Sequence, residues 1–163
     1  MRTYESLLTL IQELEGDATE IERVLTRNRT AWRRIAAGAS DPVDWGALGF
    51  TIQTVYGVLE NYFLRVSKYF ENSLPADRWH QALVDKMAVD IPGLRPALLT
   101  EPERTREVKE IMRFRHRLRN LYGEDLDPKK TQAVQETVEA FFADFPALHS
   151  RFIDKLRGIA DAL

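Results

Sequence analysis

The 163-residue chain contains no cysteine. This excludes disulfides, zinc–thiolate sites, iron–sulfur clusters and cysteine nucleophiles. It also lacks any run of about 18 apolar residues, the length that a membrane-spanning helix needs, so no membrane association is expected. The sequence turns acidic within its first five residues and shows no cleavage-site pattern, which argues against a secretory leader. We therefore expect a cytoplasmic protein.

The short motifs of several enzyme classes are missing as well. The chain has no glycine-rich phosphate loop, no His-Glu-x-x-His and no Gly-x-Ser-x-Gly. Its three histidines are scattered, and no spacing typical of metal ligands is present, so we expect neither a metal nor a cofactor. For His80 and His149, the simplest interpretation is an ordinary surface or core histidine.

The dominant signal is the helical spacing of apolar residues, and no segment alternates with the period of a strand. The pattern predicts one all-α domain over residues 1–163, a bundle of four long helices and one short helix. The first helix carries a polar residue, Asn28, within its apolar seam. Pro146 must kink or split the last helix. The expected helices are 3–37, 44–72, 78–90, 102–122 and 128–161.

Positive charge is concentrated in one helix. The chain as a whole has a formal charge of −2, whereas residues 104–119 contain seven basic and two acidic residues, a net +5. Such a concentration suits a phosphate-bearing partner, although a solvated basic face is the alternative. The candidate phosphate-binding side chains are Arg113, Arg117 and Arg119.

Arg115 is the arginine of this helix that surface patterning does not explain. At about 100° per residue, it falls inside the apolar arc that also contains Ile111 and Phe114. A buried arginine is costly unless it is paired or lies at a cleft or interface. Glu60, at the edge of the apolar stripe of helix 44–72, either pairs with Arg115 or is an ordinary boundary glutamate.

The segment from Arg115 to Tyr122 resembles the motif of the HEPN superfamily, and within it that of the HepT-like toxins of bacterial and archaeal toxin–antitoxin pairs. That motif has an arginine, four residues, a histidine, one residue and a tyrosine near the end of a helix. Four other segments of the chain also look like this branch: Glu60–Phe63, Trp79–His80, Ile91–Pro96 and Leu126–Pro128. The resemblance therefore covers roughly residues 45–155.

The resemblance implies a homodimer whose two motifs face each other across a cleft, and active members are metal-independent endoribonucleases. Arg115 would then stabilise negative charge while the RNA 2′-hydroxyl attacks the adjacent phosphate. The resemblance further implies a partner, an MNT-type nucleotidyltransferase antitoxin that silences the toxin by transferring AMP to the motif tyrosine, here Tyr122.

The chain departs from the motif at Asn120, which occupies the histidine position. Asparagine cannot transfer a proton near neutral pH, and loss of a general acid–base group typically costs about 10²–10⁴-fold in rate. Asn120 could orient the phosphate during slow, arginine-dependent cleavage, or His116, one turn earlier, could replace the histidine. The site could instead be catalytically silent and bind a nucleotidyltransferase or a nucleic acid, or Asn120 could have been introduced to silence a toxin.

Helix geometry places Arg115 and Asn120, the two catalytic positions of the motif, on different faces of the helix. Residues 115 and 120 lie about 140° apart around a helix, so their side chains do not converge. Either the helix end is distorted or a second chain completes the site, and we expect the dimer. A helical scaffold with no phosphate ligand is the third functional hypothesis, and the position of Arg115 counts against it.

Overall fold

The computed structural model describes residues 2–71, 73–121 and 124–163. The helices are α1 (Tyr4–Ala36), α2 (Pro42–Phe70), α3 (Trp79–Met87), α4 (Pro102–Arg119) and α5 (Pro128–Asp161). Within these described residues, the expected all-α fold of four long helices and one short helix is confirmed. None of the described helices is both long and apolar enough to cross a membrane.

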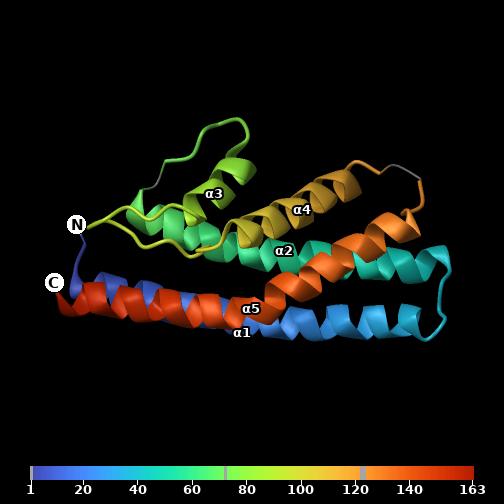
Figure 1. The fold of residues 1–163 in the computed structure, drawn as a ribbon, viewed down its shortest axis with the longest axis horizontal. Helices are drawn as coiled ribbons and strands as arrows, with labels where there is room; N and C mark the ends of the chain where they lie inside the picture. Colours follow the sequence, from blue (N-terminus) through green and yellow to red (C-terminus); the bar gives the residue numbers. More distant parts are fainter. Residues whose placement is uncertain (1, 72, 122–123) are drawn as a thin grey trace.

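The long helices form the body of the bundle (Figure 1). Helices α1 and α2 pack as an antiparallel pair, and the C-terminal half of α5 runs along α1. Helix α4 packs against both α2 and α5, and the short helix α3 contacts α2 and α4. This arrangement brings α2, α3 and α4 together on one side of the bundle, where the basic helix meets Glu60.

Local capping chemistry explains where α2 and α5 begin. Helix α2 starts two residues earlier than expected because Asp41 accepts a hydrogen bond from the Asp44 backbone N–H and Pro42 occupies the first turn. Asp127 caps α5 in the same way through the Lys130 backbone N–H. The Asp-Pro pair at each start is therefore the signal that positions both helices.

Helix α3 ends at Met87, although the sequence predicts it to reach residue 90. The carbonyl of Met87 accepts hydrogen bonds from the backbone N–H groups of Leu98 and Leu99. The carbonyls of Lys86 and Val89 accept hydrogen bonds from the Arg95 guanidinium. These distant donors satisfy the last carbonyls, so a further helical turn is not required.

Helix α5 is continuous through Pro146 and is not split. Figure 1 shows a change of direction between its orange and red halves. Proline has no backbone N–H and cannot bond to the carbonyl four residues earlier, which accounts for the bend. The sequence predicts that Pro146 either kinks or splits this helix, and the structure shows a kink.

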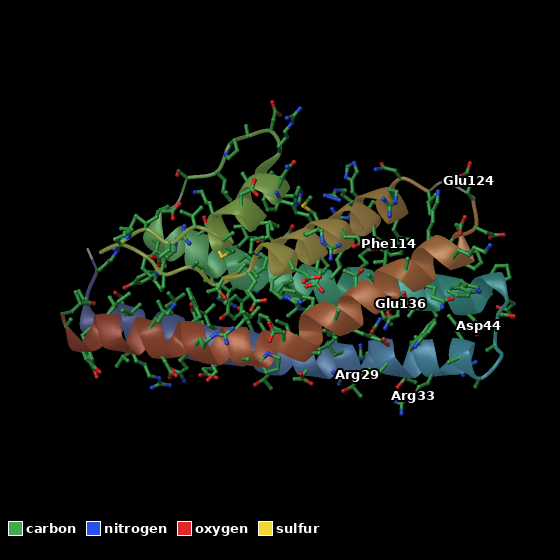
Figure 2. The ribbon with its side chains drawn as sticks, in the orientation of Figure 1. Arg29, Arg33, Asp44, Phe114, Glu124 and Glu136 are labelled. Carbon is green, nitrogen blue, oxygen red and sulfur yellow. The ribbon has the colours of Figure 1, made fainter. Side chains whose placement is uncertain are left out.

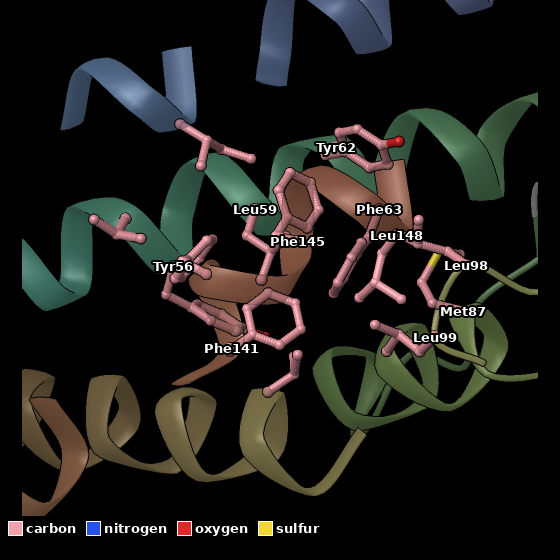
Figure 3. Close-up of a cluster of buried hydrophobic side chains, with 14 of the residues drawn as sticks. Tyr56, Leu59, Tyr62, Phe63, Met87, Leu98, Leu99, Phe141, Phe145 and Leu148 are labelled. Atoms are coloured by element: carbon pink, nitrogen blue, oxygen red, sulfur yellow. The ribbon is translucent and has the colours of Figure 1, made fainter. Parts of the chain in front are cut away.

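The core is rich in aromatic side chains where α2 and α5 meet (Figure 3). Tyr62 and Phe63 from α2 pack against Phe141 and Phe145 from α5, and all four are nearly inaccessible to solvent. The Tyr62 and Phe145 rings meet edge to face with centroids 5.7 Å apart. Burial of these rings is a major part of the stabilisation of the bundle.

The polar residue in the seam of α1 also has a structural partner. The Asn28 side chain donates to Gln135 Oε1 on α5 at 2.9 Å, and Gln135 donates back to Asn28 Oδ1 at 2.9 Å. Asn28 also donates to Thr51 Oγ1 on α2 at 3.0 Å. These buried amides are therefore satisfied, and they join the three longest helices.

Candidate functional site

A cavity of about 320 Å³ lies between α2, α3 and α4. Four arginines and two histidines contribute to its wall, and the described lining residues include no carboxylate. This concentration of hydrogen-bond donors favours an anionic occupant. The lining residues are Tyr56, His80, Met112, Arg113, Arg115, His116, Arg117 and Arg119.

The buried stripe of α4 sets the position of Arg115. Val108, Ile111 and Phe114 are buried, and the Phe114 ring lies beside Gly49 of α2, at ordinary van der Waals distance from the place that a Cβ would occupy. Figure 2 labels Phe114 on the α4 segment that lies over α2. Arg115 follows directly, and its side chain is only 14% exposed. The helix places the neighbouring arginines 113, 117 and 119 at the surface.

Arg115 is held from the side of α2. Its Nη1 donates to Glu60 Oε1 at 2.9 Å, and its guanidinium lies over the Tyr56 ring, 5.4 Å from the centroid. The Glu60 side chain is 8% exposed. Of the two interpretations of Glu60, the geometry is therefore that of a partner for Arg115. Arg115 Nε is buried and has no acceptor among the described residues.

His80 is one of the site residues that sequence reasoning missed, together with Tyr56. The His80 Nδ1 lies 2.7 Å from Glu60 Oε2, and the His80 ring stacks on Trp79 with centroids 3.6 Å apart. Glu60 therefore bridges His80 on α3 and Arg115 on α4. No spacing along the chain links these residues, because each comes from a different helix. The Trp79–His80 pair within the family resemblance was the signal available.

His149 has the ordinary role expected of it. Its Nδ1 and the Tyr62 hydroxyl are 2.9 Å apart, and its Nε2 lies 3.2 Å from Glu15 Oε2. Burial raises the pKa of the Tyr62 hydroxyl well above its usual range. None of these three residues lines the cavity. His149 is therefore a hydrogen-bonded core histidine.

The structure separates the other motif residues. His116 is exposed and lines the cavity, whereas Asn120 is the C-cap of α4 and is not among the lining residues. The Asn120 side chain donates to the His116 carbonyl oxygen at 2.9 Å. Helix α4 ends at Arg119 instead of continuing to residue 122. Tyr122 lies outside the residues that the structure describes.

Tyr56 contributes a ring to the site, not an ionisable hydroxyl. Burial raises the pKa of its hydroxyl far above the usual range, and the negative charge of Glu60 acts in the same direction. The nearby Arg115 lowers this pKa but does not offset burial. The phenol is therefore neutral, and its aromatic face supports the Arg115 guanidinium.

Within the described part of the chain, no group of three or more His, Cys, Asp or Glu side chains is placed to hold a metal ion. The arrangement offers instead a guanidinium anchored by a carboxylate, two imidazoles and further arginines. These groups can bind phosphate and move protons.

Comparison with known proteins gives one result. Residues 47–156 match the family model described as HepT-like protein. No curated protein and no solved structure gave a significant match. The matched region contains Glu60, His80 and Arg115, and it spans more than half of the chain. The chain therefore belongs to the HepT-like family of HEPN proteins.

Proposed function

We propose that the protein is a toxin-like, metal-independent endoribonuclease that binds an RNA phosphate in the cavity between α2, α3 and α4. The observation that carries the proposal is Arg115, fixed by a buried carboxylate at the wall of a cavity that three further arginines line. A guanidinium held in place can stabilise charge that develops on a phosphate without having to reorganise during the reaction.

The reaction would be an internal phosphoryl transfer. The RNA 2′-hydroxyl attacks the adjacent phosphorus, the bond to the 5′ oxygen breaks, and a 2′,3′-cyclic phosphate and a 5′-hydroxyl result. Arg115 would stabilise the additional negative charge on the phosphate oxygens. His116 lines the cavity and is exposed, and it would protonate the departing 5′ oxygen.

A second copy of the chain would complete the site. Asn120 lies at the end of α4 and does not line the cavity of its own chain. In a homodimer whose α4 helices face each other, Asn120 could contact RNA bound to the partner chain. An asparagine can position a phosphate there through its amide N–H groups.

Control by an MNT-type nucleotidyltransferase belongs to the same proposal. In the sequence, Tyr122 follows the cavity-lining Arg119 by three residues. Transfer of AMP to Tyr122 would add an anionic phosphate close in sequence to the arginines of α4, and we expect this phosphate to compete with RNA for them.

The test is cleavage of single-stranded RNA in EDTA by the wild-type chain, Arg115→Ala and Arg33→Ala. We expect cleavage to fall by about 10²–10³-fold in Arg115→Ala, the effect of losing one charge-stabilising donor. Arg33 is an exposed arginine on α1, labelled in Figure 2, and its removal should leave the rate unchanged. RNA with 2′-O-methyl groups should not be cleaved. Persistent cleavage in Arg115→Ala, or cleavage that stops in EDTA, would contradict the proposal.

A second candidate function is binding without cleavage, and Asn120 is the observation that favours it. The protein would then bind RNA or a nucleotidyltransferase and form no product. The variant Asn120→His separates the candidates. Cleavage by this variant alone would show that position 120 is the switch and that the natural chain is a silent HEPN protein.

A further inference from the structure

The transfer reaction has to move two protons, one from the attacking 2′-hydroxyl and one to the leaving 5′ oxygen. Asn120 can neither accept the first proton nor donate the second, and in the proposed reaction His116 donates the second. A further group is therefore needed near Arg115. The cavity wall contains one more imidazole, that of His80.

The contacts of His80 fix its tautomer. Glu60 Oε2 lies 2.7 Å from Nδ1, and a carboxylate oxygen accepts hydrogen bonds, so Nδ1 carries the hydrogen. In the neutral imidazole, Nε2 then holds the lone pair and can accept a proton. The stack on Trp79 restricts the ring plane, and the side chain is still 38% exposed, so a ligand in the cavity can reach it.

The same carboxylate also fixes Arg115. Glu60 Oε2 accepts a hydrogen bond from His80 Nδ1 at 2.7 Å, and Glu60 Oε1 accepts one from Arg115 Nη1 at 2.9 Å. A single buried side chain thereby sets the distance between a proton acceptor and a phosphate-binding guanidinium. The charged groups that face His80 are Glu60 from α2 and Arg115 from α4, and His116 shares its cavity.

We propose that His80, oriented by Glu60, is the general base that removes the proton from the RNA 2′-hydroxyl. The inference rests on the proposed ribonuclease function. His80 Nε2 takes the 2′ proton as the bond from the 2′ oxygen to phosphorus forms. The bond from phosphorus to the 5′ oxygen breaks, and that oxygen takes a proton from His116. The Glu60 carboxylate stabilises the imidazolium that forms on His80.

The test compares His80→Asn and His80→Ala with the wild-type chain on single-stranded RNA in EDTA. The asparagine amide nitrogen occupies the place of Nδ1 and can still donate to Glu60, but it cannot take a proton. We expect kcat to fall by about 10²–10⁴-fold in both variants, with KM little changed. Added imidazole should restore part of the lost rate in His80→Ala and none in Arg115→Ala.

Glu60→Gln is the companion variant, and Glu15→Gln is its matched control. Both carboxylates contact a histidine, but Glu15 contacts His149 and does not line the cavity. We expect cleavage to slow in Glu60→Gln and to remain unchanged in Glu15→Gln. Circular dichroism of each variant confirms that the helices are retained.

Two results would overturn the role of His80 while the proposed function stands. One is cleavage by His80→Asn at the rate of the wild-type chain. The other is loss of activity in both His80 variants with no recovery in imidazole, which would mean that His80 only holds Glu60 in place. The proposed function itself fails if the wild-type chain does not cleave or if Arg115→Ala is fully active, and the role of His80 then fails with it.

Discussion

The most deeply buried charged side chain, Arg95, illustrates how single residues are stabilised in this fold. It is 2% exposed, and its guanidinium donates to Glu71 and to the carbonyls of Lys86 and Val89. We expect Arg95→Ala to lower the free energy of unfolding by about 3–5 kcal/mol, because it removes the buried partner of Glu71, which then keeps only Lys86, and a donor from the carbonyls of Lys86 and Val89. Urea unfolding at pH 7 measures this, with exposed Arg33→Ala as the control. A loss of unfolding free energy in Arg95→Ala as small as that in Arg33→Ala would contradict this stabilising role of Arg95.

Glu71 makes the same cluster sensitive to acid. Burial alone would raise its pKa, but hydrogen bonds from Lys86 and Arg95 outweigh burial and hold the pKa below its ordinary value of 4.5. A carboxyl group with a lowered folded-state pKa stabilises the fold above about pH 4.5, and this stabilisation is lost as pH falls through the lower value. Urea unfolding between pH 3 and pH 7 should show this loss in the wild-type chain and a weaker one in Glu71→Gln. An equal pH dependence of the unfolding free energy in the two chains would refute this role of Glu71.

At the residue scale, the sequence predicts only part of the site. Arg115 stands out because a helical wheel places a charge in an apolar arc, and Glu60 stands out because it lies at the edge of another. His80 gives no such signal, because its partner lies 20 residues away on another helix. Contacts between side chains of different helices depend on how the helices pack, which periodicity within one helix does not specify.

At the scale of elements, the sequence predicts much more, because apolar spacing and Asp-Pro starts act locally. Helix α5 is observed at 128–161 as expected, and α1 differs by one residue at each end. The larger differences are C-terminal. The ends of α3 and α4 depend on distant donors and caps, such as the Asn120 side chain that donates to the His116 carbonyl, and periodicity does not reveal them.

Two glycines allow a test of helix α1 and its end. A Cβ at Gly16, inside α1, would meet no atom within 4 Å, whereas Gly38 after α1 has φ +110°. We expect Gly16→Ala to raise the free energy of unfolding by about 0.5–1 kcal/mol, since alanine loses less backbone entropy. Gly38→Ala should lower it, because alanine is strained at positive φ. Thermal unfolding of both variants measures the difference, and the same sign for both would refute it.

At the scale of the whole molecule, the charge distribution determines how RNA binding responds to salt. The chain is slightly acidic, yet the cavity is lined with arginines of α4. We expect glutamine at positions 113, 117 and 119 together to reduce the slope of log K against log salt by up to about 2, at about 0.7 per lost phosphate contact. Glutamine at the exposed α1 arginines 27, 29 and 33 removes equal charge and should leave the slope unchanged. Equal effects would indicate a general charge effect.

The reciprocal amide pair of Asn28 and Gln135 has a consequence for the alignment of the bundle. Helices joined by an apolar seam can shift by one turn, about 5.4 Å, and still bury similar side chains. Here such a shift would leave the two buried amides without each other, at a cost of about 1–3 kcal/mol for each group, and would also break the bond from Asn28 to Thr51. The hydrogen bonds of this pair therefore favour one alignment of α1, α2 and α5 along their axes. Because Glu60 belongs to α2, side chains that do not line the cavity help to determine where its carboxylate meets Arg115 and His80.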